Sequence, residues 1–467
     1  MSSTETMLAA RWHPPSFDIR VESVPIPQIQ DPDDAIVKVT LAGLCGSDLH
    51  VYRGEIAVPK IHISGHEFIG EIIQLGSNYG PNAPSTETSS QTSTETSTET
   101  STETSPRPAL YSTLKLADKV VAPFSVSCGA CAPCRTGYTS RCLSSLLFGS
   151  PRLDGGQAHD AASWVGVHTG GGGGGGNDVE VGEGEVGEGE VDVGKLLRGI
   201  NDSSLLLLSD ILPTGVFGAK QLLGHPKMQP ALTGIAWPAC LSPPSTSLTN
   251  TQTATPALTP LTPSDRLITL ALIGLGPVGV CASIALLDEL ARRGLPYKIV
   301  AIDLNEGRRE KMRRIYEVIG ADGKGGDGEF VVAGPEEAKE VVRRWTAGVG
   351  CNAVLEVVGH NSALTTAYEL VRAFGVITSV GVHAPKSLPF TGQQLYDKNI
   401  SLDFGRCPAR AMIPDAFRLL VKRQDVFGGV GTETSLIDRV TGIGEATEMY
   451  RAFEKGQIGK VLFDPWK

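Results

Sequence analysis

Apolar and polar positions alternate in two short segments near the N-terminus. Residues 35–40 alternate apolar side chains with Lys38 and Thr40, which predicts a half-buried strand. Residues 69–75 predict a second strand. Because both segments are short and a turn follows the first, we expect an antiparallel, barrel-like N-terminal domain.

The second half of the chain contains continuous apolar runs that alternate with helical patterns. Residues 267–273 and 299–302 are apolar runs that predict buried strands, with a helix predicted at residues 280–293 between them. Residues 353–359 and 375–381 look like later strands of the same kind of sheet, with residues 363–372 as the helix between them. Buried strands that alternate with helices indicate an α/β fold with a doubly wound parallel sheet. Amphipathic helices are also predicted at residues 413–422 and 445–454, in a tail that folds back on the N-terminal domain.

Three segments have compositions that cannot bury apolar surface. Residues 84–108 are rich in Ser, Thr and Glu, residues 169–194 in Gly and acidic residues, and residues 238–264 in Pro, Ser and Thr. We expect solvated loops or linkers, which are either surface elaborations or in part products of a faulty gene model. The expected organisation is then a first domain at 1–209, a second at 210–404 and a C-terminal return at 405–467.

Composition narrows the class of protein. The chain has 467 residues, of which 41% are hydrophobic, so it can form two or more domains with real cores. Its formal net charge of −10 argues against a nucleic-acid partner, which normally meets a basic face. We expect no membrane span and no signal peptide, and therefore a cytoplasmic protein.

Cys45 and His66 together indicate half of a catalytic zinc site. Each residue lies at one end of a predicted strand, and thiolate and neutral imidazole are ligands suited to tetrahedral Zn²⁺. Asp48 and Glu67 lie beside them as acids that can orient the ligands. Either residue alone would more simply be a buried thiol or a core histidine. Their pairing favours a metal, and it requires a third ligand elsewhere.

Four of the nine cysteines lie within fifteen residues. Cys128, Cys131, Cys134 and Cys142 have the spacing C-x2-C-x2-C-x7-C, which suits four thiolates on one ion. An iron–sulfur cluster is a weaker interpretation, because the fourth cysteine is too distant and no proline follows it. Disulfides would need an oxidising compartment. We therefore expect a closed structural zinc site without chemistry of its own.

A glycine-rich turn follows the predicted strand 267–273 and precedes the helix 280–293. In this context the motif predicts a dinucleotide site, because the turn lets a pyrophosphate approach the backbone and a helix N-terminus. Its cofactor-binding residues are Gly274, Gly276, Pro277, Val278 and Gly279. Asp303 ends the next strand, where it can bind ribose hydroxyls and repel a 2′-phosphate, so NAD is expected. Arg308 and Arg309 keep NADP open as the alternative.

The segment around His66 resembles the zinc signature of the zinc-dependent alcohol dehydrogenases, in the medium-chain dehydrogenase/reductase family. The matching residues are Gly65, His66, Glu67, Gly70 and Gly76. The resemblance implies a GroES-like β-barrel catalytic domain and a Rossmann domain. The four-cysteine segment also matches the family's structural-zinc lobe, so two zinc ions per chain are expected.

The resemblance also identifies a third catalytic ligand. Residues 205–215 resemble the family's entry helix, where the ligand is Asp in a branch that includes glutathione-independent formaldehyde dehydrogenases and secondary alcohol dehydrogenases. Asp210 is that ligand by resemblance, and its carboxylate can replace a thiolate without changing the charge of the site. From the residues alone, Asp210 is equally well the N-cap of a helix that starts at Ile211.

The family implies hydride transfer between the CH–OH group of a small alcohol, or the corresponding carbonyl compound, and NAD. By resemblance the proton leaves through Ser47 to His50, Glu67 and Asp48 support the zinc ligands, and Thr214 lies near the nicotinamide. A homodimer or homotetramer is the family's expectation. The alternatives are a polyol, threonine or formaldehyde dehydrogenase of the same fold, or a non-catalytic NAD-binding relative.

Overall fold

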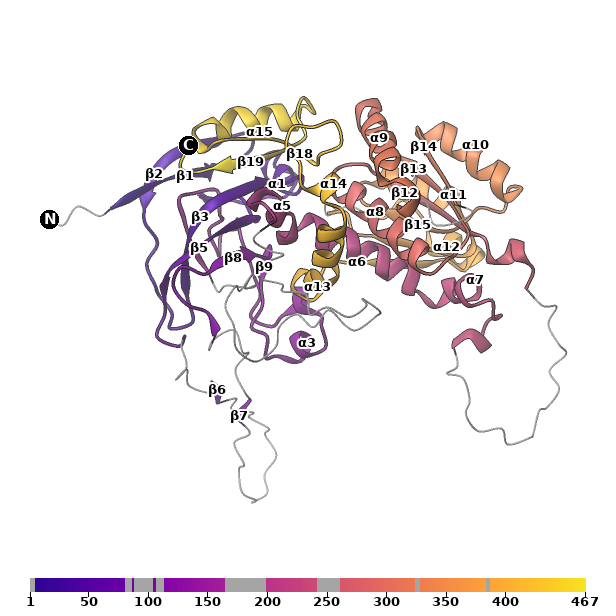
Figure 1. The fold of residues 1–467 in the computed structure, drawn as a ribbon, viewed down its shortest axis with the longest axis horizontal. Helices are drawn as coiled ribbons and strands as arrows, with labels where there is room; N and C mark the ends of the chain where they lie inside the picture. The colour runs from indigo at the N-terminus through magenta and orange to yellow at the C-terminus, as the bar shows by residue number, and fades with distance from the viewer. Residues whose placement is uncertain are drawn as a thin grey trace, which may run out of the picture. The chain divides into compact units, whose positions relative to one another are not determined.

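The computed structural model describes residues 5–79, 86–87, 104–105, 113–163, 199–241, 261–323, 328–383 and 387–467. The chain forms two compact units (Figure 1). The first comprises residues 1–210, 408–431 and 436–467, and the second comprises residues 211–407 and 432–435.

The first unit is built on antiparallel strands. Its main sheet has the order β18-β19-β3-β5-β8, with β11 also paired to β3, and smaller sheets have the orders β2-β1-β4 and β10-β9. The strands are β1 (Thr6–Trp12), β2 (Ile19–Pro25), β3 (Ala35–Leu44), β4 (His62–Ile63), β5 (Phe68–Leu75), β8 (Lys119–Ala122), β9 (Ser125–Val126), β10 (Leu146–Leu147), β11 (Asp160–Ser163), β18 (Ile437–Gly442) and β19 (Lys460–Asp464). The predicted strands 35–40 and 69–75 are confirmed as parts of β3 and β5.

The C-terminal residues complete the main sheet of the first unit. Strand β19 pairs in parallel with β18 and antiparallel with β3, where Val461 lies opposite Leu44. The helices of this part are α13 (Ala409–Lys422), α14 (Gln424–Phe427) and α15 (Ala446–Glu454). The two predicted amphipathic helices are therefore confirmed, whereas strands β18 and β19 were not predicted.

Short helices connect the strands of the first unit. They are α1 (Asp48–Tyr52), α3 (Ala132–Arg135), α5 (Asp202–Leu206) and the 3₁₀ turns η1 (Thr139–Arg141) and η2 (Leu207–Ser209). The predicted entry helix 205–215 is interrupted, because η2 ends at Ser209 and the next helix starts only at Ile211. Asp210 lies at this break, with a non-helical backbone (φ −150°, ψ −69°).

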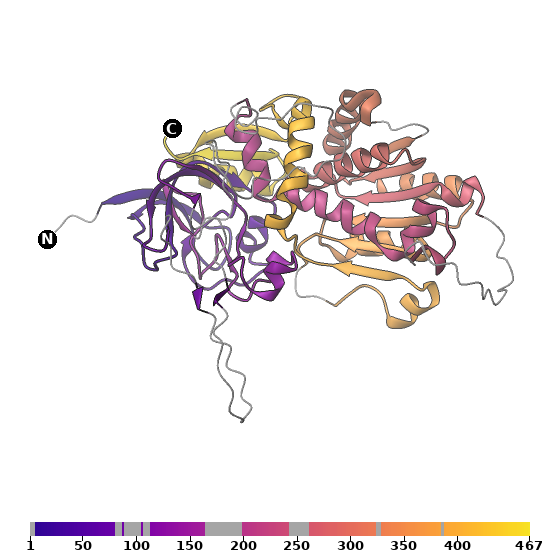
Figure 2. The same ribbon diagram turned by 60° about the horizontal axis from the view of Figure 1, so that its bottom comes forward.

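The second unit contains a six-stranded sheet in which every pairing is parallel, with the order β14-β13-β12-β15-β16-β17 (Figure 2). This order is that of a doubly wound dinucleotide-binding fold. The strands are β12 (Ile268–Ile273), β13 (Tyr297–Ile302), β14 (Glu329–Ala333), β15 (Cys351–Glu356), β16 (Val371–Ser379) and β17 (Ser401–Phe404). The helices are α6 (Ile211–Gly224), α7 (Gln229–Thr233), α8 (Pro277–Arg292), α9 (Glu306–Gly323), α10 (Pro335–Thr346), α11 (Asn361–Leu370) and α12 (Gly392–Lys398).

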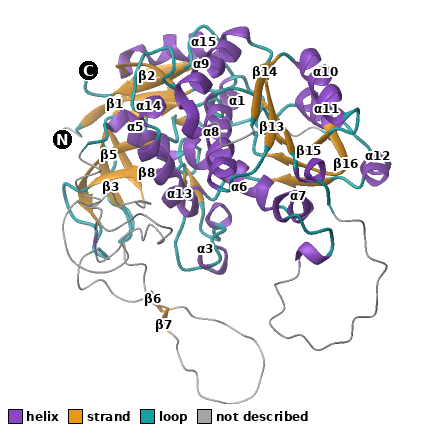
Figure 3. Ribbon diagram, turned by 45° about the vertical axis from the view of Figure 1, so that its right-hand side comes forward, coloured by secondary structure: helices purple, strands orange, loops and turns teal. Residues whose placement is uncertain are grey.

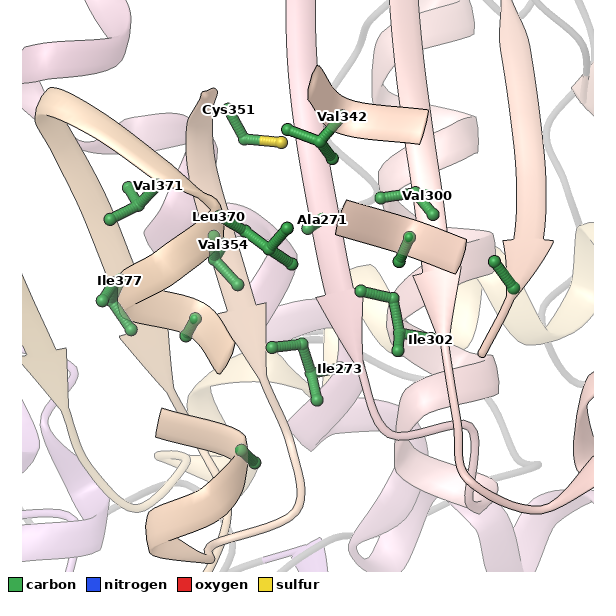
Figure 4. Close-up of a cluster of buried hydrophobic side chains, with 14 of the residues drawn as sticks. Ala271, Ile273, Val300, Ile302, Val342, Cys351, Val354, Leu370, Val371 and Ile377 are labelled. Carbon is green, nitrogen blue, oxygen red and sulfur yellow. The ribbon is translucent and has the colours of Figure 1, made fainter. Parts of the chain in front are cut away.

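Helices cover both faces of this sheet, with α8 and α9 on one side and α10 and α11 on the other (Figure 3). On the second side, Ala271, Ile273, Val300, Ile302 and Val354 point into a dry cluster with side chains of α10 and α11 (Figure 4). Burial on both faces explains why these strands are continuous apolar runs in the sequence.

Three predicted elements in this unit have wrong ends. The segment 353–359 ends as a strand at Glu356, and residues 357–359 lie outside it. The helix 363–372 ends at Leu370, because Arg372 already belongs to β16. The strand 375–381 ends at Ser379 and begins earlier than predicted, at Val371. Sequence patterns locate such ends poorly, because an apolar or helical pattern can continue beyond the last backbone hydrogen bond of the element.

The three low-complexity segments lie largely outside the described residues. In the first, only β6 (Thr86–Glu87) and β7 (Thr104–Ser105) are described, and they pair antiparallel, so this segment is not entirely loop. The second, 169–194, lies outside altogether. Of the third, the ends are described, with short 3₁₀ turns at Ala239–Leu241 and Pro263–Arg266. Among the helices that the structure describes, none combines the length and apolar character of a membrane span.

Candidate catalytic metal centre

Cys45, His66, Glu67 and Asp210 form one cluster in the first unit. One ligand atom from each lies within 4.8 Å of the others. Cys45 follows β3 and His66 precedes β5, and the antiparallel pairing of these strands, with Ala42 opposite Phe68, brings the two residues together. Asp210 joins them from the break before α6. The structure thus assembles all three residues that the sequence proposed as catalytic ligands.

The polar atoms of this cluster converge on one point. Asp210 Oδ2 lies 3.4 Å from Cys45 Sγ and 3.3 Å from His66 Nε2. Ser47 Oγ lies 3.2 Å from the same sulfur and 3.1 Å from the same nitrogen. A thiol, an imidazole and a carboxylate in this arrangement are the donor set of a catalytic zinc site.

Asp48 fixes the orientation of His66. Its Oδ1 lies 2.9 Å from His66 Nδ1, and its Oδ2 accepts a hydrogen bond of 3.0 Å from the backbone N–H of Cys45. A carboxylate partner makes Nδ1 the protonated nitrogen, so the lone pair of Nε2 faces the cluster. Asp48 therefore holds the imidazole of His66 and the backbone of Cys45 in place beside the cluster.

Glu67 and Lys460 form a buried ion pair behind the cluster. Both residues are at most 1% exposed, and Lys460 Nζ donates to Glu67 Oε2. The other oxygen, Oε1, is buried and has no hydrogen-bond partner among the described residues. Gly43 makes room for this carboxylate, because a Cβ there would lie 2.0 Å from Oε2. An unpartnered buried oxygen beside three other donors fits a bound cation.

No sequence pattern pointed to Lys460, which is 393 residues from Glu67 along the chain. Only the pairing of β19 with β3 brings it to the site. One feature of the sequence could have indicated its role: Lys460 begins an apolar run near the C-terminus. If this run is a buried strand, the charge of the lysine needs a buried acidic partner.

Burial and neighbouring charges raise the pKa values of three residues in the cluster. Burial raises the pKa of Cys45, and the charges of Glu67 and Asp210 raise it further. Burial opposes protonation of His66, but the charge of Asp48 and the hydrogen bond to Asp210 raise its pKa well above the usual value. Burial also raises the pKa of Glu67, against the effect of Lys460. A metal ion would replace these protons, since its ligands bind in the deprotonated form.

The two residues of the predicted proton path have different partners. Ser47 contacts the cluster, whereas His50 Nδ1 lies 2.6 Å from Glu55 Oε2. Within residues 5–79 no side-chain hydrogen bond joins Ser47 to His50. Glu55, whose side chain is exposed, is a contact of His50 that the sequence did not single out.

The four cysteines form a second cluster in the first unit, with all four sulfurs within 4.8 Å of one another. Cys131 precedes α3 and Cys142 follows η1, and none of the nine cysteines forms a disulfide. Backbone N–H groups point at the sulfurs, as in the bond of 3.2 Å from Cys128 to Cys142. Burial opposes ionisation of Cys131, but backbone hydrogen bonds at Leu143 and Cys134 lower its pKa to about 6. These four thiols can hold one zinc ion.

The predicted dinucleotide-binding residues lie at the carboxyl ends of β12 and β13 in the second unit. Gly274 turns the chain with φ 101°, Gly276 is the N-cap of α8, and the helix begins with Pro277, Val278 and Gly279. This 16-residue helix directs its N-terminus at the turn, which favours an anion there.

Asp303 joins the tips of the two strands. Its Oδ2 accepts a hydrogen bond of 2.7 Å from the backbone of Leu275, and its Oδ1 accepts one of 2.8 Å from Asn305. Arg308 Nη1 lies 3.6 Å from Oδ2, whereas Arg309 donates to the carbonyl of Asp303. The predicted Thr214 lies in α6 and is buried.

Comparison with known proteins defines the family. The model of the alcohol dehydrogenase GroES-like domain matches residues 31–94, and that of the zinc-binding dehydrogenases matches residues 278–422. Zinc-type alcohol dehydrogenase B of Aspergillus flavus is 31% identical over 463 residues, which cover 99% of this chain and 82% of the relative. The chain therefore belongs to the zinc-type alcohol dehydrogenases of the medium-chain dehydrogenase/reductase family. It is an oxidoreductase that acts on an alcohol or an aldehyde.

Solved structures confirm the predicted fold, a GroES-like barrel with a Rossmann sheet. Alcohol dehydrogenase TADH from Thermus sp. ATN1 matches with a TM-score of 0.64 and 23% identity, over 98% of this chain and 99% of that one. Acetophenone reductase from Geotrichum candidum, solved in complex with NAD, matches with a TM-score of 0.62 and 18% identity, over 99% and 98% of the two chains.

Proposed function

We propose that this chain is an NAD-dependent zinc alcohol dehydrogenase in which Cys45, His66 and Asp210 hold the catalytic zinc. The observation that supports this assignment is the convergence of a thiol, an imidazole and carboxylates within 4.8 Å in the barrel of this family. Zinc, when bound, supplies a Lewis acid that lowers the pKa of an alcohol hydroxyl, and NAD supplies the hydride acceptor.

The residues of the chain prepare and complete this chemistry. Asp48 keeps the lone pair of His66 Nε2 directed into the cluster, and Lys460 compensates the charge of Glu67. Ser47 is the first proton acceptor, because its hydroxyl lies within 3.2 Å of two proposed ligand atoms. His50 and Glu55 carry the proton onward. A water molecule must bridge Ser47 and His50, since their side chains do not bond directly.

We infer a second, structural zinc on Cys128, Cys131, Cys134 and Cys142. Four thiolates close the coordination shell, so this ion has no position for substrate. The N–H groups that point at the sulfurs support this role.

NAD is the proposed cofactor in preference to NADP. The carboxylate of Asp303 stands at the end of β13, where it favours ribose hydroxyls and repels a 2′-phosphate. Arg308 Nη1 lies 3.6 Å from the Asp303 carboxylate. The positive charge of Arg308 is therefore partly compensated and would attract a 2′-phosphate less strongly. NADP remains the alternative that cofactor kinetics must exclude.

The candidate substrates are simple alcohols, polyols, threonine and formaldehyde. A curated relative over part of the chain is a glutathione-independent formaldehyde dehydrogenase, and another is a sorbitol dehydrogenase. A dimer or tetramer and a cytoplasmic location stay predictions.

Zinc analysis and cofactor reduction test the proposal together. We expect about two zinc ions per purified chain, one of them removed more readily by chelation, and alcohol-dependent reduction of NAD that exceeds that of NADP. A panel of primary, secondary and polyol substrates, threonine and hydrated formaldehyde would identify the class. A single zinc that survives Cys45→Ala would contradict the proposal, because the catalytic cluster would then hold none.

A further inference from the structure

A second buried network lies in the second unit and has no part in the chemistry described above. Glu356 ends β15 and is fully buried, Ser379 ends β16, and His383 follows four residues later. Ser379 Oγ lies 2.5 Å from Glu356 Oε2 and 2.8 Å from His383 Nε2. The side chain of His383 is 22% exposed, so the network runs from a buried carboxylate to the surface of this unit.

The hydrogen bonds of this network define the tautomer of His383. Glu356 Oε1 accepts two backbone N–H bonds of 2.7 Å, from Val358 and Gly359, and the hydroxyl of Ser379 donates to Oε2. The single proton of Ser379 is therefore not available to His383. His383 Nε2 must then donate to Ser379, which leaves Nδ1 as the nitrogen that can accept. Among the described residues, Nδ1 has no hydrogen-bond partner.

Close backbone packing places His383 at the predicted cofactor edge. A Cβ on Gly381 would lie 2.2 Å from the nitrogen of Gly359, so the turns after β15 and β16 touch without intervening side chains. The turn after β15 in turn packs on the glycine motif, since a Cβ on Gly274 would lie 2.7 Å from Val358 Cγ2. His383 thus lies along the same carboxyl edge of the sheet as the proposed pyrophosphate site.

The strand order indicates which half of a dinucleotide His383 would meet. Asp303, the proposed partner of the adenosine ribose, follows β13 on one side of β12, and His383 follows β16 on the other. The glycine motif after β12 lies between them. In a doubly wound sheet the dinucleotide extends across this crevice, so the nicotinamide nucleoside belongs on the side of β15 and β16.

We propose that His383 is a cofactor-positioning residue that accepts, through Nδ1, a hydrogen bond from an O–H or N–H group of the nicotinamide nucleoside. Ser379 and Glu356 hold the imidazole in the required tautomer. This inference rests on the proposed function, because it requires that the second unit binds a nicotinamide dinucleotide.

The test compares NADH with ADP-ribose, which has the same pyrophosphate and adenosine but no nicotinamide. Dissociation constants are measured on the full-length protein by calorimetry or fluorescence, without alcohol. His383→Phe should weaken NADH binding about 10-fold, the loss of about one hydrogen bond, and should change ADP-ribose binding less than about 2-fold. His383→Gln should restore much of the NADH affinity, because its amide offers both a donor and an acceptor.

A control variant separates the loss of a contact with the nicotinamide nucleoside from a general loss of stability in the turns after β15 and β16. His360 follows β15 as the N-cap of α11, and its Nδ1 already bonds Ser362, so His360→Phe should change neither affinity by more than about 2-fold. Equal losses of NADH and ADP-ribose binding in His383→Phe would assign a purely structural role and overturn the inference, as would unchanged NADH binding. Failure of the unmodified protein to bind either nucleotide would instead overturn the proposed function itself.

Discussion

The two cysteine-containing clusters of the first unit differ in how their charge is compensated. The four thiols lie within fifteen residues and receive N–H bonds from their own loop, and all but the buried Cys142 are partly exposed. The cluster of Cys45, His66, Glu67 and Asp210 is mostly buried and draws its members from segments up to 165 residues apart. In a local, partly exposed site, water and backbone N–H groups can stabilise the negative charge of the thiolates. The buried site has little access to water and therefore requires a buried cation, Lys460.

This difference also separates the proposed roles. Four formal negative charges, on Cys45, Asp48, Asp210 and Glu67, would face the two charges of a bound Zn²⁺ and the one of Lys460, which leaves one net negative charge. In a buried site of this kind, a small change of charge on a bound substrate has a large electrostatic effect. The four-thiolate site would keep two net negative charges and would have no open ligand position. Variants of each cluster should therefore fail in different ways.

The largest effect is expected for Cys45→Ala. Loss of one catalytic ligand should reduce turnover of any alcohol at least about 10³-fold, equivalent to about 4 kcal/mol of transition-state stabilisation, and lower the zinc content by about one ion. Cys240→Ala, at a cysteine outside both clusters, is the control and should retain activity. Steady-state kinetics with elemental analysis would check this, and an active, fully zinc-loaded Cys45→Ala would contradict it.

Cys131→Ala should act on stability more than on chemistry. Opening the four-thiol site should lower the free energy of unfolding by about 5 kcal/mol, because a structural metal site contributes directly to folding. Chemical denaturation and zinc analysis measure the effect. The folded fraction should keep its turnover per catalytic zinc, and a loss of turnover without a loss of stability would reverse the proposed roles of the two clusters.

Lys460→Met tests whether the buried cluster depends on its cation. Removing one partner of a buried ion pair leaves Glu67 uncompensated, and the free energy of unfolding of the metal-free protein should fall by about 3 kcal/mol. Lys455→Met, an exposed lysine in the same C-terminal segment, is the matched control and should change stability by less than about 0.5 kcal/mol. Equal stabilities of the two variants would show that the pair does not matter.

Asp48→Asn should weaken zinc binding at the buried cluster about 10- to 100-fold, the usual effect of altering a partner that orients a metal-bound histidine. Competition with a chelator indicator would measure this affinity. The four-thiol site should be unaffected in the same sample. If both sites lost affinity equally, Asp48 would act on folding and not on His66.

Acid should release zinc from the buried cluster. The raised pKa values of Cys45 and His66 mean that zinc must displace protons from this cluster, so its affinity should fall up to about tenfold per pH unit for each proton displaced. A fluorescent zinc indicator would follow the release. A zinc affinity of this cluster that does not change between neutral and acidic pH would contradict the prediction.

Most of the fold followed from sequence patterns because those patterns reflect burial. Strands β12, β13 and β15 are buried on both faces and are therefore mostly apolar, and the glycine motif after β12 is local by nature. Strand β19 was missed because it begins with Lys460, whose burial depends on a distant partner. The end of β15 was misplaced because the apolar run continues into its turn.

The sequence by itself determined the family, the four-cysteine site and the pairing of Cys45 with His66, since each is written in short-range spacing. It left Asp210 open between a helix cap and a ligand. Only the tertiary structure brought Asp210 to Cys45 and His66, placed Lys460 behind Glu67, and linked Glu356, Ser379 and His383. The physical reason is that these contacts arise from strand pairing and from backbone packing between turns, which one-dimensional patterns do not encode.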